Sequence, residues 1–157
     1  MKISLITVTY NSGKTLSTTL DSVLAQTHPN IEYIIVDGAS KDNTVDVIKE
    51  YEPRFNGTLK WVSEPDKGIY DAMNKGIRMA SGELVGILNS DDYYESTAVK
   101  DMIEAMSDYP YQILYGFLRT LKDGVERNIS IGSHLFLREG MIGHPACFIT
   151  KQLYDEL

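Results

Sequence analysis

Apolar runs alternate with amphipathic segments along the first two thirds of the chain. Residues 3–8, 31–36, 59–62 and 83–88 are short apolar stretches, which predict four buried strands. Between them, apolar side chains recur with helical spacing, as in Leu16, Leu20 and Val23. Strands that are apolar throughout and alternate with helices indicate a mostly parallel sheet with helices on both faces.

The pattern changes after Pro110. Residues 112–121 and 125–131 flank Lys122, Asp123 and Gly124, a combination typical of a hairpin turn. Residues 147–149 predict a last short strand, and Thr150 can cap a final helix that runs into Leu157. We therefore expect an α/β fold whose sheet becomes mixed toward the C-terminus, in a single domain over residues 1–157.

Composition narrows the class of partner. The chain has 15 basic and 22 acidic residues, a formal charge of −7, which disfavours nucleic acid as a partner. Its one cysteine, Cys147, has no partner for a disulfide, which favours a reducing, cytoplasmic location. Thr7 interrupts the first apolar run too early for a signal peptide, and no stretch reaches the roughly 20 apolar residues of a transmembrane segment.

Polar residues follow each predicted strand at the point where it ends. They are Thr9, Tyr10 and Asn11, then Asp37, then Glu64 and Asp66, then Asp91 and Asp92. Ligands of a parallel sheet bind beyond the carboxyl ends of its strands. Each of these residues is also a common turn former, but acids gathered together repel one another unless a cation or polar ligand compensates. The set predicts a metal or a polar ligand at this edge.

Asp91 and Asp92 directly follow the fourth apolar run. Carboxylates are hard oxygen ligands that suit Mg or Mn, and no cysteine or histidine cluster points to zinc instead. Alternatively, Asp92 or Ser96 could cap the next helix. The chain has neither a Walker loop nor a G-x-G-x-x-G turn, so a diphosphate would have to bind through a metal and side chains.

Four segments carry a family resemblance: ISLITVTYNSGKTL, IIVDGASKDNT, EPDKGIYDAMNKGI and ASGELVGILNSDDYY. Together they resemble the successive motifs of glycosyltransferase family 2, which has the Rossmann-like GT-A fold. The match is continuous over residues 3–94 and looser across GHPACFITKQLYDEL. It implies metal-dependent transfer of a sugar from a nucleoside-diphosphate sugar, such as a UDP-sugar, to an acceptor hydroxyl with inversion, in polysaccharide or cell-envelope glycan synthesis.

The resemblance also implies site residues. The donor-binding set is Val8, Thr9, Tyr10, Asn11, Asp37, Asp66, Lys67, Asn74 and Asp91. Within it, Val8, Thr9 and Tyr10 would line the base pocket and Asp37 would bond the base edge. Asp66 and Lys67 would lie beside the ribose or diphosphate, with Asp91 toward the ribose and sugar. The divalent metal, Mn or Mg, would be held by Asp92 directly, with Asp91 beside it.

His144 is implied, together with Asp92, as a catalytic residue. In similar sequences this histidine faces the acceptor or the pyrophosphate, although a purely structural turn histidine is an equally open interpretation. Lys67 and Lys75 could add positive potential or simply be solvated. The acceptor would be a glycan or a lipid-linked molecule, reached in the cytoplasm or at the inner face of the membrane.

The chain departs from the family in one respect. Inverting members use an aspartate or glutamate as general base, placed after the region where this chain ends, and we expect Asp155 and Glu156 to be surface residues. We therefore expect a C-terminally truncated, donor-binding domain. The alternatives are a nucleotide-sugar-binding module without catalysis, and an acidic-pocket signalling domain of flavodoxin-like topology, which leaves EPDKGIYDAMNKG unexplained. The sequence leaves the donor sugar, the acceptor and the oligomeric state open.

Overall fold

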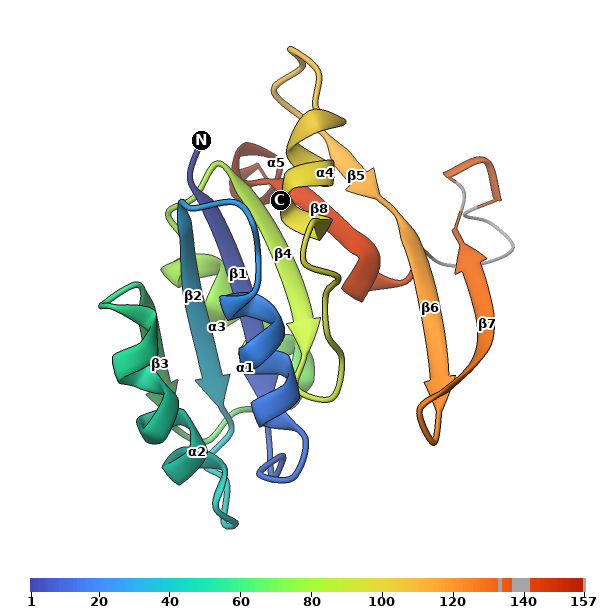
Figure 1. The fold of residues 1–157 in the computed structure, drawn as a ribbon. Coiled ribbons are helices and arrows are strands. Elements are labelled where there is room, and N and C mark those ends of the chain that lie inside the picture. Colours follow the sequence, from blue (N-terminus) through green and yellow to red (C-terminus); the bar gives the residue numbers. More distant parts are fainter. Residues whose placement is uncertain (133, 137–141, 157) are drawn as a thin grey trace.

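Six strands form the main sheet, in the order β3-β2-β1-β4-β8-β5 (Figure 1). The computed structural model describes residues 1–132, 134–136 and 142–156. The strands are β1 (Ile3–Thr9), β2 (Ile31–Asp37), β3 (Leu59–Ser63), β4 (Leu84–Asn89), β5 (Ile113–Tyr115) and β8 (Cys147–Thr150). β1 to β4 are parallel, whereas β8 runs antiparallel to β4 and β5. The predicted α/β fold with a sheet that becomes mixed toward the C-terminus is confirmed.

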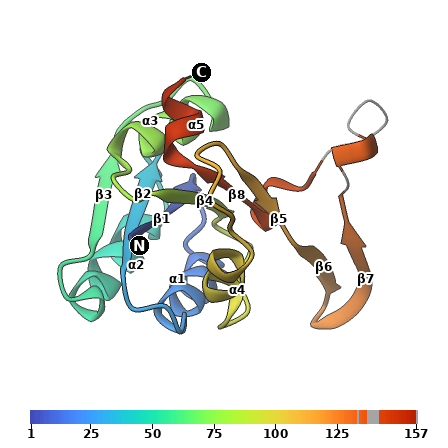
Figure 2. The same cartoon turned by 90° about the horizontal axis from the view of Figure 1, so that it is seen from above.

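Helices cover both faces of this sheet (Figure 2). One face carries α1 (Leu16–Leu24), α2 (Thr44–Tyr51) and α4 (Ala98–Glu104), and the other carries α3 (Ile69–Met79) and α5 (Lys151–Asp155). Successive strand residues point to opposite faces, so Ile3 and Leu5 of β1 join the core under α1 while Ile6 and Val8 join the core under α3. Three short 3-10 helices complete the list: η1 (Glu52–Phe55), η2 (His134–Phe136) and η3 (His144–Ala146).

α3 lies unusually close to β1. A Cβ atom on Gly76 of α3 would stand 2.4 Å from Cγ2 of Ile6, closer than side chains pack. Because glycine has no Cβ, α3 can pack against β1 at this position without a clash with Ile6. The N-terminal end of α3, which carries the EPDKG turn, is thereby set at the edge where the strands end.

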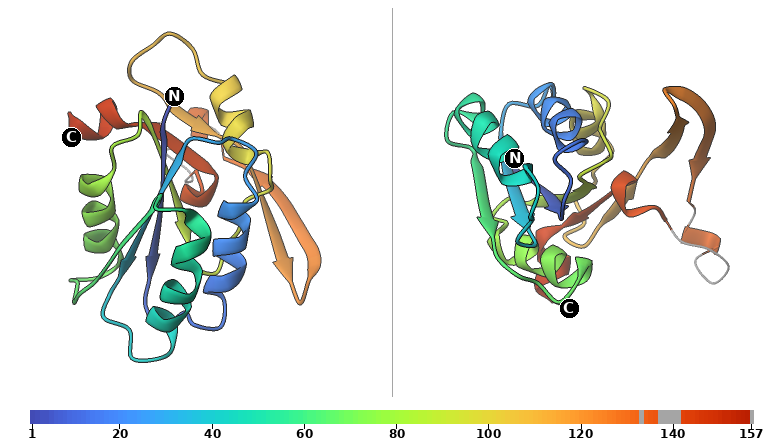
Figure 3. Two further views of the ribbon diagram at one scale, coloured as in Figure 1. Left: turned by 60° about the vertical axis from the view of Figure 1, so that its left-hand side comes forward. Right: turned by 90° about the horizontal axis from the view of Figure 1, so that it is seen from below.

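β6 (Phe117–Lys122) and β7 (Val125–Ile131) form the predicted hairpin. Asp123 and Gly124 both have positive φ, 54° and 72°, as a primed two-residue turn requires. The hairpin forms a sheet of its own instead of extending the main one, and it stands away from the rest of the chain (Figure 3). The mixed character of the main sheet thus comes from β8 alone, which lies between β4 and β5.

The last helix begins where the sequence predicts but is not capped as predicted. Thr150 occupies the N-cap position of α5 without a side-chain capping bond. Its hydroxyl instead accepts a hydrogen bond from the Gln112 backbone N–H at 3.0 Å. The helix ends at Asp155, and Leu157 lies outside the described residues. Of the helices described, none combines the length and the apolarity needed to cross a membrane.

The amino end of the sheet holds a buried carboxylate. Glu32 of β2 is 3% exposed and accepts hydrogen bonds from Lys2, Lys60, Ser4 and Ser81. Burial alone would raise the pKa of Glu32, but the four donors together bring that pKa well below its usual range. The ionised carboxylate therefore stabilises the folded chain, at the end of the sheet opposite to the predicted ligand edge.

We expect Glu32→Gln to lower the free energy of unfolding by about 2 kcal/mol at pH 7, because it removes a buried acceptor of charged hydrogen bonds. The pKa of Glu32 is depressed in the folded state, so this contribution is present above the unfolded pKa of about 4.3 and declines as the pH falls below it. Urea unfolding from pH 7 to pH 3 measures both effects. Glu50→Gln, at an exposed position of α2, is the matched control, and an equal difference at pH 7 and pH 3 would contradict the expectation.

Candidate functional site at the carboxyl ends of the strands

The carboxyl ends of the four parallel strands meet at one edge. Thr9 of β1 is level with Asp37 of β2, and Asp37 is level with Ser63 of β3. On the other side of β1, Val8 is level with Asn89 of β4. The edge that was predicted from four separate strand ends is therefore a continuous one.

Asp37 is fully buried, and both of its carboxylate oxygens are engaged. Oδ2 accepts hydrogen bonds from the Ser40 backbone N–H at 3.0 Å and from Ser63 Oγ at 2.6 Å, and Oδ1 accepts one from Ser40 Oγ. The carboxylate thus joins the ends of β2 and β3 and shapes the turn after β2. Its predicted contact with the base edge stays a prediction.

The segment after β1 divides into buried and exposed residues. Val8 is 6% exposed and packs in the core under α3, while Tyr10 is 61% exposed at the edge of the sheet. Between them, the Thr9 hydroxyl is buried and has no hydrogen-bond partner among the described residues. An unpaired buried hydroxyl is costly, so Thr9 is an unusual position at this edge of the sheet.

Asn11 joins this segment to the turn after β2. Its side-chain oxygen accepts a hydrogen bond from the Lys41 backbone N–H at 2.8 Å, and its own N–H donates to Ser40 Oγ at 2.8 Å. Its φ of 53° is a left-handed conformation that asparagine tolerates better than most residues. Asn11 therefore holds the two loops together, whether or not it also contacts a ligand.

Asp66 leans over the turn after β2. Its Oδ1 accepts a hydrogen bond from the Gly68 backbone N–H at 2.8 Å, and a Cβ atom on Gly38 would come within 2.6 Å of Oδ2 and 3.4 Å of the Tyr10 ring. Asp66, Tyr10 and the backbone at Gly38 are consequently neighbours. Three residues from three strand ends meet here, two of which belong to the predicted donor-binding set.

The two lysines near this turn differ. Lys67 is exposed, and its backbone N–H donates to Asp71. Lys75 of α3 ties the EPDKG turn to the helix through Glu64 Oε1 at 2.9 Å and the Pro65 carbonyl at 3.0 Å. Its hydrogen bond with Glu64 raises the pKa of Lys75, so the ammonium is engaged in the turn, whereas Lys67 and the exposed Asn74 are open to solvent.

Asp91 and Asp92 occupy the turn after β4. Asp91 is exposed and Asp92 half-buried, with Asp92 Oδ2 accepting a hydrogen bond from Asn89 Nδ2 at 2.8 Å. The Asp92 carbonyl also accepts one from the Thr19 hydroxyl at 2.7 Å. α4 begins only at Ala98, after Thr97 in the N-cap position, so neither Asp92 nor Ser96 caps it. The capping alternative for the aspartate pair is therefore excluded.

The electrostatics of the pair suit a cation. Burial raises the pKa of Asp92, the hydrogen bond from Asn89 lowers it, and the negative charge of Asp91 raises it again, with a net upward shift. A cation beside the two carboxylates would offset this repulsion. No group of three or more acidic, histidine or cysteine ligands exists among the described residues. Two carboxylates completed by phosphate oxygens are nevertheless a common way to hold Mg, so the residues present fit a metal–diphosphate unit.

His144 lies beside the same turn. It is exposed at the start of η3, and its Nε2 is 3.0 Å from Asn89 Oδ1. A residue 55 positions away in the sequence is thus bonded to the asparagine that also holds Asp92. The sequence predicted no role for Asn89, which lies between the fourth apolar run and the aspartate pair. Its one signal was that it follows the apolar run directly.

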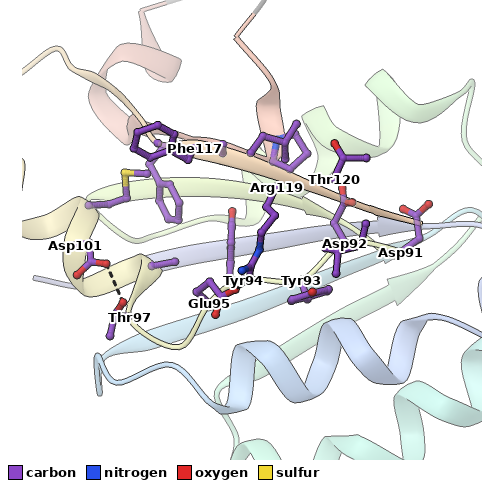
Figure 4. Close-up of a pocket in the computed structure, with 18 residues that line it drawn as sticks. Asp91, Asp92, Tyr93, Tyr94, Glu95, Thr97, Asp101, Phe117, Arg119 and Thr120 are labelled. Atoms are coloured by element: carbon purple, nitrogen blue, oxygen red, sulfur yellow. Dashed lines mark hydrogen bonds and ion pairs between the residues drawn. The ribbon is translucent and has the colours of Figure 1, made fainter. Parts of the chain in front are cut away.

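A cavity of about 640 Å³ lies between α4, β6 and η3, next to the aspartate turn (Figure 4). Asp91 and Asp92 lie at one end of its wall, and Asp101 at the other. Arg119 is ion-paired with Glu95 across it, and Asp101 accepts a hydrogen bond from the Thr97 hydroxyl at 2.8 Å. Of the predicted donor set, all of which lies within residues 1–132, only Asp91 lines this cavity.

The cavity residues from the hairpin were missed by the sequence analysis. Phe117 and Arg119 sit in a strand with ordinary hairpin patterning, and nothing local marks them as neighbours of Asp91. Asp155, the last residue of α5, and Glu156, which follows it, are exposed, as expected, and Asp155 lines a different cavity beside Met1 and Gly82.

A mostly parallel sheet with a carboxylate pair after its fourth strand is the architecture of the GT-A transferases. The chain belongs to Glycosyl transferase family 2, whose sequence pattern matches residues 4–149. An uncharacterized glycosyltransferase of Mycobacterium tuberculosis is 40% identical over 162 aligned positions, covering 99% of this chain and 61% of the relative. A PGL/p-HBAD biosynthesis glycosyltransferase of Mycobacterium bovis is 33% identical, covering 98% and 61%. The chain thus spans about three fifths of the length of these relatives.

Solved structures show the same fold. Residues 1-349 of TarS of S. aureus, in complex with UDP-GlcNAc, superpose with a TM-score of 0.80 at 23% identity, over 99% of this chain and 47% of that one. A mannosyltransferase of Pyrobaculum calidifontis, in complex with GDP-Man and Mn2+, gives a TM-score of 0.58 at 29% identity, over 63% of this chain and 31% of that one. The predicted GT-A architecture is confirmed.

We expect Gly38→Ala to weaken UDP binding by about tenfold, because the added Cβ would push Asp66 away from the turn after β2. Ala39→Gly is the matched control in the same turn: it relieves a φ of 62°, so affinity should be kept and the melting temperature should rise slightly. Calorimetric titration with UDP and thermal melting measure the two quantities. Equal affinity in both variants would show that the contact at Gly38 does not shape a nucleotide site.

Proposed function

We propose that this chain is the donor-binding domain of an inverting glycosyltransferase. It would bind a nucleoside-diphosphate sugar, most simply a UDP-sugar, together with Mn2+ or Mg2+, for transfer of the sugar to the hydroxyl of a glycan or lipid-linked acceptor. The setting would be polysaccharide or cell-envelope glycan synthesis, in the cytoplasm or at the inner face of the membrane. The relative named for PGL/p-HBAD biosynthesis supports a glycolipid acceptor.

The position of the aspartate pair carries this proposal. Asp91 and Asp92 follow β4, which has the ends of β1, β2 and β3 on one side and the cavity between α4 and β6 on the other. A donor molecule bound with its diphosphate at the pair would have its nucleotide over the strand ends and its sugar at the mouth of the cavity.

The charge balance explains why a metal is part of the proposal. A diphosphate is anionic, the chain carries a formal charge of −7, and the carboxylates of the pair would repel the ligand on their own. A bound divalent ion would neutralise the charge that develops on the departing nucleoside diphosphate. The exposed Asp91 carboxylate and the oriented Asp92 carboxylate would hold it. The Pyrobaculum mannosyltransferase, solved with GDP-Man and Mn2+, supports this assignment.

Each proposed donor-binding role rests on its own structural observation. Thr9 offers a buried hydroxyl without a partner among the described residues, and Tyr10 offers an exposed ring next to the Gly38 turn. Lys67 is exposed beside Asp66, within reach of solvent. We propose that the base stacks near Tyr10, that Thr9 bonds the nucleotide, and that Lys67 lies toward the diphosphate. Val8 and Asn11 would act mainly by supporting this segment.

We assign no general base among the described residues. Besides the aspartate pair, the cavity is lined by two carboxylates, and both are engaged: Glu95 with Arg119, and Asp101 with Thr97. His144 is proposed to face the acceptor or the diphosphate from the edge of the aspartate turn. A nucleotide-sugar-binding domain without catalysis is the second candidate, favoured by this engagement of the cavity carboxylates.

Binding of UDP should depend on the metal and on the aspartate pair. We expect Mn2+ to increase the affinity for UDP at least tenfold, and Asp92→Asn or Asp91→Asn to abolish this increase. The metal-free affinity should rise slightly in these variants, because each substitution removes one carboxylate that repels the diphosphate. Calorimetric titration with and without Mn2+ measures it, with GDP as a second nucleotide. Asp108→Asn, at an exposed position away from the edge, is the charge-matched control.

Metal-independent binding of UDP that survives both substitutions would contradict the proposed metal site. Absence of binding to both UDP and GDP would contradict the proposed function. To separate an enzyme from a binding module, UDP release from a UDP-sugar is then followed in the presence of simple glycosides, with a longer chain that matches the full length of the relatives. Turnover above the level of the Asp92→Asn variant would favour the enzyme, and tight binding without turnover would favour the module.

A further inference from the structure

One side chain connects the aspartate turn to the segment before β8. Asn89, the last residue of β4, donates from Nδ2 to Asp92 Oδ2 at 2.8 Å, and its Oδ1 is 3.0 Å from Nε2 of His144. The three residues thus form a chain, from the exposed imidazole through the half-buried amide to the half-buried carboxylate. Both distances are those of well-formed hydrogen bonds.

The chemistry of this chain requires an amide in the middle. An asparagine side chain can donate to a carboxylate and accept from a ring N–H at the same time. Because Oδ1 can only accept, this hydrogen bond requires a proton on Nε2 of His144, which selects that tautomer of the neutral ring. An aspartate at this position would have no donor for Asp92, and an apolar residue would have neither function.

Asn89 is also the side chain that fixes the Asp92 carboxylate. The remaining hydrogen bonds of Asp92 within the described residues involve its backbone: the carbonyl accepts from the Thr19 hydroxyl, and the N–H donates to the Asn89 carbonyl at 3.2 Å. The turn as a whole is held by the contact between the Ser12 and Ser90 hydroxyls at 2.8 Å. Without the Asn89 amide, the half-buried carboxylate would be free to rotate, and His144 would lose its contact with β4.

We propose that Asn89 is a positioning residue that orients Asp92 toward the divalent cation and anchors His144 beside it. This inference rests on the proposed function, since it assigns a role at the same site. Residues that orient a metal ligand through a hydrogen bond contribute about 10- to 100-fold to metal affinity. Asn89 acts through Asp92 and His144 and is not itself placed on the ligand.

The first measurement is the Mn2+ affinity of the chain saturated with UDP, followed by calorimetry and by the spin-resonance signal of free Mn2+. We expect Asn89→Leu, which keeps the size of the side chain but removes both hydrogen bonds, to weaken Mn2+ binding at least tenfold. Its affinity for UDP in the absence of metal should equal that of the unmodified chain. Asn128→Leu, on an exposed position of β7, is the matched control and should change neither value.

The second measurement tests the coupling to His144. His144→Ala should weaken Mn2+ binding by a smaller factor, and His144→Gln should restore it, because a glutamine side chain can still donate to Asn89 Oδ1. The Asn89→Leu, His144→Ala double variant should lose no more affinity than Asn89→Leu alone, since both substitutions break one chain of contacts. His144 is exposed, so its substitution should not lower the stability of the fold. The His144 variants therefore test the inference even if Asn89→Leu destabilises the chain.

The outcomes separate the inference from the function on which it rests. Unchanged Mn2+ affinity in Asn89→Leu, or losses that simply add in the double variant, would overturn the positioning role while the metal site stands. A glutamine that fails to replace His144, together with a nitrogen coupling in the Mn2+ signal, would overturn it in favour of direct ligation by the histidine. Absence of Mn2+ binding by the unmodified chain would overturn the proposed function and the inference with it.

Discussion

The parallel pairing of β1 with both β2 and β4 is the constraint on which the rest of the site depends. Parallel neighbours bring their carboxyl ends to the same edge, and the register places Thr9 level with Asp37 and Val8 level with Asn89. Each following loop therefore starts from the same line. The close approach of α3, allowed by Gly76, keeps the EPDKG turn at that edge as well. Side chains from four separate loops lie at one edge because the parallel register of the strands places the start of each loop there.

Glu32 and Asp92, at opposite ends of the sheet, have opposite electrostatic environments. At the amino end, Glu32 is surrounded by donors that include two lysines, and its pKa is lowered. At the carboxyl end, Asp92 receives one amide hydrogen bond, faces Asp91, and has its pKa raised. The first arrangement is self-contained and stabilises the fold. The second leaves negative charge that no described lysine or arginine pairs with, and this is the difference on which the proposed cation site rests.

The antiparallel strand β8 completes the edge from the other direction. By lying between β4 and β5 it brings η3, and with it His144, next to the end of β4. The same arrangement sets β6 opposite α4, so that the aspartate turn borders a cavity as well as a row of strand ends. The pair Asp91 and Asp92 thus stands between the row of strand ends and the cavity between α4 and β6.

The sequence by itself determined the elements and the edge at which they would act. Strand and helix periods, the Asp123-Gly124 turn and the polar residues after each strand are local signals, and local sterics and burial are enough to interpret them. Only the tertiary structure decided which groups are engaged and which are available. Asp37 is saturated by Ser40 and Ser63, the hairpin stays apart from the main sheet, and Asn89 bonds a histidine 55 residues away. These outcomes depend on distances between residues far apart in the chain, which no local pattern encodes.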